Sequence, residues 1–344
     1  MNSQKTELSR EKTSNQRWTE AILFFPSELR KVLLMIPPDI QLKLIEIRLR
    51  INQPLELNFG KTASFITSKG DLTSDYQEAL GIGAELLRKT LNAFTTSSLY
   101  ALEEELNQGY LALPGGHRVG ITGQIFYNAG SIRMIRNISS INFRIARPIT
   151  GIARPLLPFL WKERRFLKTM IIGAPATGKT TLLREIIREV SSGVPELGLP
   201  GIHVGLVDER SEIAGSYQGV PQLEVGPRTD VLDGCSKKDG VYLLLRAMNP
   251  QLIATDEVGR EDDIRVIEDI INAGVSFIAT AHARNLTEAI LRPGLKRVLQ
   301  EGAVERLVTV SNRLGIGTVE SIKSGVSGPE LLTKGLMGVN GWSK

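Results

Sequence analysis

The sequence has few of the features that mark a secreted or membrane-spanning protein. Cys235 is the only cysteine among the 344 residues, so no internal disulfide can form, and the composition suits a reducing compartment. The longest apolar stretches, residues 21–25 and 32–36, fall far short of the roughly 20 residues that a bilayer crossing needs. Residues 1–20 are polar and mixed in charge, without the apolar core of a secretory signal. We therefore expect a cytoplasmic protein.

Aromatic residues and net charge are also low. Aromatic side chains make up 6% of the chain and offer few platforms on which nucleic-acid bases could stack. The net charge of +5 permits an anionic partner, whether a nucleotide, a nucleic acid or a lipid surface, but does not require one. Hydrophobic residues make up 42% and charged residues 23%, which is close to the usage of globular proteins and argues against global disorder.

Changes of pattern along the chain predict two domains with flanking tails. Residues 1–17 are rich in Ser, Thr, Asn, Gln and Lys, and we expect a disordered tail there. Residues 18–147 mix short helical and extended segments, including an alternating strand at 46–51, which is typical of a small α+β domain. Proline, glycine and basic residues across 148–165 indicate an interdomain linker. Residues 325–344 contain Gly and Ser, and we expect a loosely packed C-terminal tail.

Residues 166–324 alternate apolar strands with helices. An extended segment at 167–172 leads into a glycine-rich loop, and apolar residues from Leu182 to Val190 then recur at helical spacing. Further strands are expected at 203–207, 252–255 and 275–280, edge strands at 304–310 and 318–322, and helices at 241–248 and 262–273. Strands that alternate with helices predict an α/β domain with a mainly parallel sheet covered on both faces.

The glycine-rich loop has the sequence and setting of a phosphate-binding loop. It reads Gly173-Ala174-Pro175-Ala176-Thr177-Gly178-Lys179-Thr180 and lies between a strand and a helix. Glycine lets the backbone curl so that N–H groups and the helix dipole point at phosphate oxygens. Lys179 would reach the β- and γ-phosphates, the Thr180 hydroxyl would ligate Mg²⁺, and Thr181 would lie on the α-phosphate side. The loop predicts ATP and Mg²⁺ as ligands, and the alternative is a glycine-rich turn without a ligand.

A pair of carboxylates follows the strand expected at 252–255. Phosphoryl transfer needs a carboxylate for the Mg²⁺ shell and a group that orients the attacking water. Asp256 would hold a metal-bound water, and Glu257 would polarise the nucleophile or the metal shell. The alternative is that both residues only cap the next helix.

Two further polar clusters follow apolar strands. Residues 207–212 contain Glu209 and Glu212 just past one strand, and His282 lies past another. The carboxyl ends of parallel strands are where α/β sheets place their ligands, so these side chains are candidates for catalysis, with His282 placed to sense a γ-phosphate. The alternatives are a solvated charged loop for the glutamates and a hydrogen-bonded structural role for the histidine.

Several arginines could contact phosphates. A guanidinium group neutralises charge that develops in the transition state, often from a neighbouring domain or subunit. Arg144, Arg147 and Arg260 rank first because they lie in or beside the interdomain connection and the acidic strand end. Arg118 and Arg210 are further candidates. Each of the five could instead be a solvated surface residue.

Seven stretches of the chain together resemble a known family. They are residues 46–50, 115–120, 142–147, 173–180, 207–215, 254–260 and 279–282. Over about residues 18–322, the chain resembles the stage III sporulation AA family, which belongs to the type II/IV secretion ATPase superfamily. The resemblance implies a RecA-like P-loop ATPase domain, preceded by a smaller α+β N-terminal domain, that hydrolyses ATP to ADP and phosphate.

The resemblance also implies catalytic roles, partners and a location. By position, the catalytic glutamate of the acidic box would be Glu212 or Glu209, and the histidine box would be the stretch around His282. The family implies a ring-shaped homo-oligomer, expected to be a hexamer, that powers a membrane-embedded channel or secretion complex between mother cell and forespore during endospore formation. It would act from the cytoplasm, peripherally at the inner face of that complex. A nucleic-acid-associated RecA-like ATPase is the alternative, although no stable nucleic-acid partner is expected.

Overall fold

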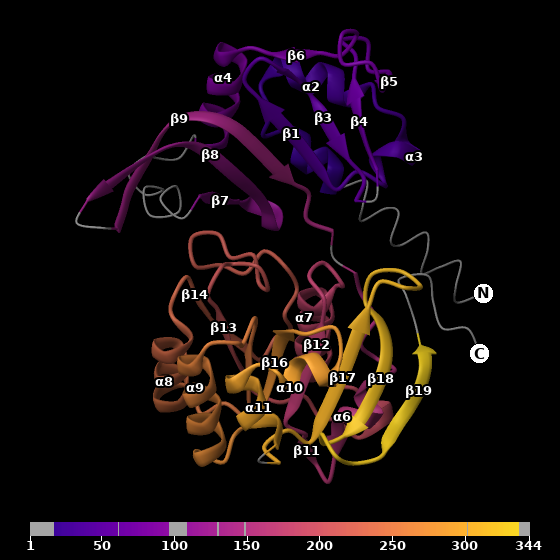
Figure 1. Ribbon diagram of the computed structural model, residues 1–344, viewed down its shortest axis with the longest axis vertical. Coiled ribbons are helices and arrows are strands. Elements are labelled where there is room, and N and C mark those ends of the chain that lie inside the picture. Colours follow the sequence, from indigo (N-terminus) through magenta and orange to yellow (C-terminus); the bar gives the residue numbers. More distant parts are fainter. Residues whose placement is uncertain are drawn as a thin grey trace. The chain divides into compact units, whose positions relative to one another are not determined.

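The computed structural model describes residues 17–60, 62–95, 109–128, 131–147, 149–300 and 302–336 (Figure 1). The chain divides into two compact units, with the division between Arg147 and Pro148. The tail expected at residues 1–17 lies outside the described residues, except for Arg17. Among the described helices, none combines the length and the apolar character that a bilayer crossing requires.

The N-terminal unit is built on an antiparallel sheet of seven strands in the order β5-β4-β3-β1-β9-β8-β7. Its strands are β1 (Glu46–Arg50), β3 (Glu56–Asn58), β4 (Ala63–Ile66), β5 (Leu72–Thr73), β7 (Tyr110–Leu113), β8 (His117–Asn128) and β9 (Ser131–Arg144). A separate short pair is formed by β2 (Gln53–Pro54) and β6 (Gly81–Ile82). Its helices include α2 (Ser27–Leu34), α3 (Pro38–Gln41) and α4 (Ala84–Phe94), and residues 17–22 are helical as well. The small α+β domain predicted from the sequence is confirmed.

Strand and helix periodicities explain the core of this unit. In β1, Ile47 and Leu49 are fully buried while their neighbours are partly exposed, which is the alternation of a half-buried strand. In α4, the buried residues include Leu87 and Phe94, seven positions apart and therefore on one face of the helix. Phe94 packs against Phe143 of β9 with the ring centroids 5.5 Å apart. The helix is thereby fixed to the sheet.

His117, at the start of β8, is a buried imidazole within this core. It is 1% exposed, stacks on Phe143 at a centroid distance of 5.4 Å, and accepts the main-chain N–H of Ala146 at Nδ1 at 3.2 Å. Burial lowers the pKa of His117 from 6.5 to about 4, and the positive charge of Arg17 contributes to the shift. The folded unit therefore favours the neutral imidazole.

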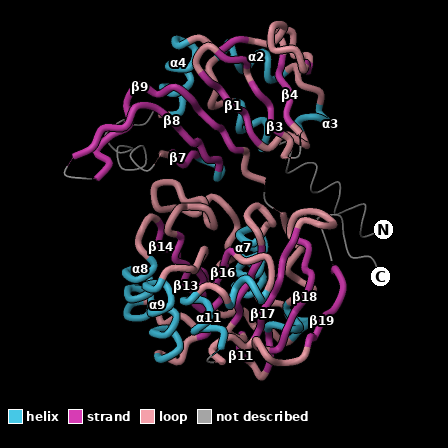
Figure 2. Tube along the Cα trace, viewed as in Figure 1, coloured by secondary structure: helices cyan, strands magenta, loops and turns pink. Residues whose placement is uncertain are grey.

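The C-terminal unit is built on a sheet of eight strands in the order β14-β13-β15-β16-β12-β17-β18-β19. Figure 2 shows strands and helices of this unit by colour, with β18 and β19 side by side at one edge. Its strands are β12 (Thr169–Gly173), β13 (Val204–Asp208), β14 (Thr229–Asp233), β15 (Leu252–Thr255), β16 (Ser276–His282), β17 (Arg306–Ser311), β18 (Thr318–Ser324) and β19 (Glu330–Leu336). The first six strands in this order pair in parallel, and β18 and β19 add an antiparallel edge. Strands β12, β13 and β15 are buried at every position, as a parallel sheet with two covered faces requires.

Helices cover both faces of this sheet. They are α7 (Lys179–Ser192) on one face, and α8 (Lys237–Ala247), α9 (Glu261–Asn272), α10 (Leu286–Ile290) and α11 (Pro293–Gln300) on the other. The alternation within β12 shows the two layers, because Ile171 packs in the core with α7 whereas Met170 and Ile172 pack in the core with α8 and α9. The predicted α/β class with a mainly parallel sheet is confirmed.

Two segments expected to be irregular contain regular structure. Residues 148–165, expected as a linker, include α6 (Leu157–Leu160), and Ala153, Leu156 and α6 contribute buried side chains to the core beneath α7. Pro155 and Pro158 interrupt the helical spacing of these apolar residues, so the sequence pattern favours a linker there. A hairpin of β10 (Trp161–Lys162) and β11 (Arg165–Phe166) follows. The tail expected at 325–344 contributes β19 to the sheet, and its last residues, 337–344, lie outside the described part.

A His117→Gln substitution tests the buried imidazole. Because the folded pKa is depressed, the imidazole stabilises the fold above its ordinary pKa of 6.5, and this stabilisation is lost as the pH falls toward 4. We expect wild type to lose about 2 kcal/mol of unfolding free energy through this group between pH 7.5 and pH 5, and the variant to lack that loss. Urea unfolding at both pH values measures the difference. His203→Gln, at an exposed position, is the control, and equal pH dependence in wild type and His117→Gln would contradict the assignment.

Candidate nucleotide-binding site

The phosphate loop, residues 173–178, connects β12 to α7 and is confined by close backbone packing. Gly178 has a φ of +89°, and a Cβ there would lie 2.5 Å from Cγ2 of Ile316. A Cβ on Gly173 would lie 2.5 Å from the carbonyl oxygen of Val310. Both distances are shorter than real Cβ contacts, so only glycine fits at either position. The loop therefore has the tight curl that a phosphate cradle needs.

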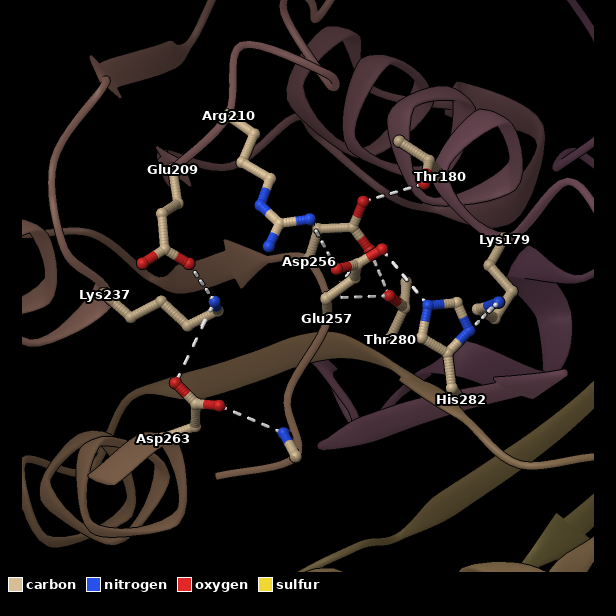
Figure 3. A network of polar contacts seen from close by, with 11 residues as sticks. Lys179, Thr180, Glu209, Arg210, Lys237, Asp256, Glu257, Asp263, Thr280 and His282 are labelled. Atoms are coloured by element: carbon tan, nitrogen blue, oxygen red, sulfur yellow. Dashed lines mark hydrogen bonds and ion pairs between the residues drawn. The ribbon is translucent and has the colours of Figure 1, made fainter. Parts of the chain in front are cut away.

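Lys179, the first residue of α7, lies against the end of the sheet (Figure 3). It is 5% exposed, and its Nζ donates to the carbonyl of Ala174 at 2.9 Å and to Nδ1 of His282 at 3.0 Å. Burial lowers the pKa of Lys179, while the negative charges of Asp256 and Glu257 oppose that shift. The lysine thus places a largely desolvated cation beside the loop, where its attraction for an anionic group is strong.

The next residue of α7 links the helix to the carboxylates after β15. The Thr180 hydroxyl donates to Oδ2 of Asp256 at 2.7 Å. The other oxygen, Oδ1, accepts the main-chain N–H of Glu257 at 2.9 Å and the hydroxyl of Thr280. Hydroxyl and carboxylate oxygens are ligands that Mg²⁺ prefers. Thr180 and Asp256 fit the expected Mg²⁺ shell, and their role as ligands stays a prediction.

Glu257 connects His282 to Arg210. His282 is the last residue of β16 and lies opposite Gly173 in the parallel pairing of β16 with β12. Its Nε2 lies 3.1 Å from Oε1 of Glu257, and Oε2 of Glu257 lies 3.3 Å from Arg210. Because Nδ1 of His282 accepts from Lys179, we assign the proton to Nε2, which donates to Glu257. A chain of polar contacts therefore runs from the phosphate-loop lysine to the acidic loop after β13 (Figure 3).

Asp208, the last residue of β13, organises that acidic loop. It is 2% exposed, and its two oxygens accept the main-chain N–H groups of Glu212 at 2.8 Å, Ile213 at 3.0 Å and Ala214 at 2.8 Å. Burial raises the pKa of Asp208, and the three main-chain donors oppose that rise. Arg184 of α7 donates to the Glu212 carbonyl at 3.0 Å. The backbone at Glu212 is therefore fixed to both the strand end and α7.

Lys237 links the two acidic loops. It begins α8, is 7% exposed, and forms an ion pair with Glu209. Its Nζ also lies 3.9 Å from Oδ1 of Asp263, whose Oδ2 accepts the main-chain N–H groups of Gly259 at 3.0 Å and Arg260 at 2.9 Å. One buried cation therefore connects the loop after β13 to the loop after β15 (Figure 3).

A small cavity brings most of the acidic candidates together. It is lined by Asp208, Glu209, Arg210, Glu212, Lys237, Asp256 and Glu257. The predicted residues among them come from two loops far apart in the sequence. They meet because β13 and β15 are parallel neighbours, so both loops leave the same edge of the sheet.

Asp208 and Lys237 were not predicted as site residues. The local sequence does contain a signal for Asp208, because an aspartate at the end of an apolar strand can accept main-chain N–H groups of the turn that follows it. For Lys237 the local sequence indicates only a helix start after the N-cap Ser236. Its partner Glu209 lies 28 positions earlier, and only the fold brings the two together.

The three arginines ranked first differ in the contacts of their side chains. Arg260 is exposed at the start of α9. Arg144 pairs with Glu46 at 3.5 Å, and Arg147 donates to two main-chain carbonyls, all within the N-terminal unit. Burial lowers the pKa of Arg147. Contact of these arginines with phosphate stays a prediction.

An Asp208→Ala substitution tests the organising role of this carboxylate. Three main-chain N–H groups would lose their acceptor, and we expect the unfolding free energy to fall by about 2–4 kcal/mol. Asp208→Asn keeps one acceptor oxygen, so a smaller loss is expected. Urea or thermal unfolding measures both. Asp262→Ala, at an exposed position on α9, is the control and should change stability by less than about 0.5 kcal/mol. A loss in Asp208→Ala no larger than in the control would refute the role.

Comparisons with known proteins agree on the architecture. The solved structures that resemble the chain include the ATPase DotB of Legionella pneumophila, with a TM-score of 0.54 and 16% identity. They also include the ATPase DotB of Yersinia pseudotuberculosis, with a TM-score of 0.52 and 15% identity. Each alignment covers 83% of this chain, with 76% and 75% of the respective DotB chains. At these identities the likeness establishes the fold, and the predicted RecA-like architecture is confirmed.

Sequence comparison establishes the family. The chain is 40% identical to stage III sporulation protein AA of Bacillus subtilis (strain 168) over 297 residues, which are 86% of this chain and 92% of that protein. The family model described as sporulation stage III, protein AA matches residues 15–327. The resemblance noted in the sequence motifs is confirmed, and this chain belongs to the sporulation stage III protein AA family.

Proposed function

We propose that this chain hydrolyses ATP and works as a motor for a membrane-associated complex. The observation that carries the proposal is the 2.7 Å hydrogen bond from Thr180 to Asp256, beside a loop in which Gly173 and Gly178 admit no Cβ. This arrangement offers two Mg²⁺ ligands next to a phosphate cradle. Membership of the sporulation family and the fold shared with two ATPases support the proposal.

ATP would be held mainly by its phosphates. Main-chain N–H groups of residues 173–178 and the start of α7 would bind the β-phosphate oxygens. Lys179 would exchange its present partners for the β- and γ-phosphates, and Thr181 would contact the α-phosphate. Mg²⁺ held through Thr180 and Asp256 would neutralise phosphate charge.

Hydrolysis requires a carboxylate that accepts a proton from water. The water oxygen bonds to the γ-phosphorus, the bond from phosphorus to the ADP oxygen breaks, and the water proton passes to the carboxylate. Glu257, Glu212 and Glu209 line the cavity beside Asp256, and one of them would take this role. Glu257 also hydrogen bonds to His282, which connects it to the phosphate-loop lysine.

Family membership supports a proposed cellular role. The Bacillus subtilis relative is named for stage III of sporulation, so the proposed setting is endospore formation. The chain would form a homo-oligomeric ring, expected to be a hexamer, and act from the cytoplasm on a membrane complex between mother cell and forespore. Arg144, Arg147 and Arg260 would contribute positive charge to the phosphates, within one subunit or across a subunit boundary.

A Lys179→Ala substitution tests nucleotide binding. It removes the cation that would face the phosphates, so we expect affinity for ATP to fall at least about tenfold and Mg²⁺-dependent phosphate release to be lost. Titration calorimetry and a phosphate-release assay measure the two effects. Lys238→Ala, at an exposed position on α8, is the matched control. Wild-type turnover in Lys179→Ala would rule out this site.

The same phosphate-release assay separates the motor from the nucleic-acid alternative. Single-stranded DNA or RNA is added to the wild-type protein, and we expect turnover to stay unchanged. Strong stimulation by either polymer would favour a nucleic-acid-associated ATPase.

Separate glutamine substitutions of Glu209, Glu212 and Glu257 identify the catalytic base. In the variant that lacks the base, kcat should fall by about 10²- to 10⁴-fold while ATP still binds. The reason is that the amide keeps the size of the side chain but cannot accept the proton. The other two variants should lose less than about tenfold. If all three variants keep wild-type kcat, none of these glutamates is the base.

A further inference from the structure

The loop between β17 and β18, residues 312–317, packs directly against the phosphate loop. The main-chain N–H of Gly317 donates to the carbonyl of Thr177 at 2.8 Å. On the same loop, Cγ2 of Ile316 occupies the space that a Cβ on Gly178 would need. The position of this loop is therefore fixed relative to the residues that would hold the phosphates.

Internal hydrogen bonds give the 312–317 loop a defined shape. The Thr318 hydroxyl donates to the Gly315 carbonyl at 2.7 Å and accepts the main-chain N–H of Leu314 at 3.2 Å. Arg313 is held by Glu320 at 3.1 Å. Gly315 has a φ of +124°, which a side chain rarely allows. The loop is thus a constrained turn, and its side chains are presented in fixed directions.

Two large aliphatic side chains of this loop face solvent beside the phosphate loop. Leu314 is 49% exposed and Ile316 is 43% exposed. A single exposed aliphatic residue is ordinary on a protein surface. Here two of them stand two positions apart on a constrained turn that contacts the residue preceding α7. Ile316 lies against Gly178 of the phosphate loop, and Leu314 precedes it by two positions on the same turn, beside the proposed site for a charged ligand.

The order of the strands indicates on which side of β12 each end of a bound nucleotide would lie. Strands β16 and β17 flank β12 on opposite sides. Asp256 and His282, which would lie toward Mg²⁺ and the γ-phosphate, follow β15 and β16 on one side. In a nucleoside triphosphate the base is at the opposite end from the γ-phosphate. With the γ-phosphate toward β16, the nucleoside would leave the phosphate loop on the other side, toward β17 and the 312–317 loop.

We propose that Leu314 and Ile316 form the surface on which the purine ring of the bound nucleotide packs. The proposal rests on the nucleotide binding proposed above and adds the recognition of the base to it. An aliphatic surface excludes water from the face of a purine and so contributes affinity. It offers no hydrogen-bonding group, so these two side chains add affinity for purine nucleotides without selecting between adenine and guanine.

The test compares a ligand that has a base with one that does not. Titration calorimetry measures the binding of ATP and of inorganic triphosphate, each with Mg²⁺, to wild type and to the double variant Leu314→Ala, Ile316→Ala. We expect the variant to bind ATP about tenfold more weakly and triphosphate with unchanged affinity, since only the apolar contact with the base is removed. Leu291→Ala, which truncates an aliphatic side chain that is 77% exposed elsewhere in this unit, is the control.

Other outcomes are distinguishable. Unchanged affinity for ATP in the double variant overturns the proposal. An equal loss for ATP and triphosphate also overturns it, because the loop would then act by supporting the phosphate loop. Wild type that binds neither ligand would refute nucleotide binding itself, and the inference with it. Thermal unfolding of each variant tests whether the substituted protein is still folded.

Discussion

The register of the parallel sheet is the constraint on which the candidate site depends. The hydrogen bond from Thr180 to Asp256 joins the start of α7 to the end of β15, which is two strands away from β12. It can form because β16 pairs with both strands in a fixed register, with Gly173 opposite His282 and Thr255 opposite Ala279. A shift of one residue would point the side chains of a strand to the opposite face of the sheet. The continuous apolar packing on both faces holds this register, so the two hydrophobic cores stabilise the site as well as the fold.

Burial of charged groups makes the site sensitive to the loss of any one partner. Lys179, Asp208 and Lys237 are each less than 8% exposed. A buried charge costs several kcal/mol unless hydrogen bonds or an opposite charge compensate for it. The compensation differs among the three: Lys179 donates to a carbonyl and an imidazole, Asp208 accepts three main-chain N–H groups, and Lys237 pairs with a carboxylate. These partners come from separate loops and from the end of β16, so the buried charges help to hold these segments together.

The sequence predicted the parts of this architecture that have local signals. The phosphate loop lies between a strand and a helix, and Asp256 and His282 stand at strand ends, where a parallel sheet brings side chains together. The strand β14 and the buried segment around Leu157 were missed, because β14 is only partly buried and the prolines near Leu157 interrupt its helical pattern. Lys237 could not be predicted at all, since its importance comes from a contact between distant segments. Motifs at strand ends and helix starts can be predicted from the sequence. The contacts that compensate a buried charge depend on the tertiary structure and cannot.

The distribution of charge around the cavity distinguishes Asp256 from Asp208, Glu209 and Glu257. Asp208 is satisfied by main-chain N–H groups, Glu209 has Lys237, and Glu257 has Arg210. Asp256 is bonded instead to two threonine hydroxyls and a main-chain N–H, which orient its oxygens without neutralising them. Lys179 and Arg184 attract it over a longer range, and under the proposed function Lys179 turns to phosphate. A divalent cation that enters with a nucleotide would therefore meet, at Asp256, a carboxylate whose oxygens are oriented by hydroxyl and main-chain donors.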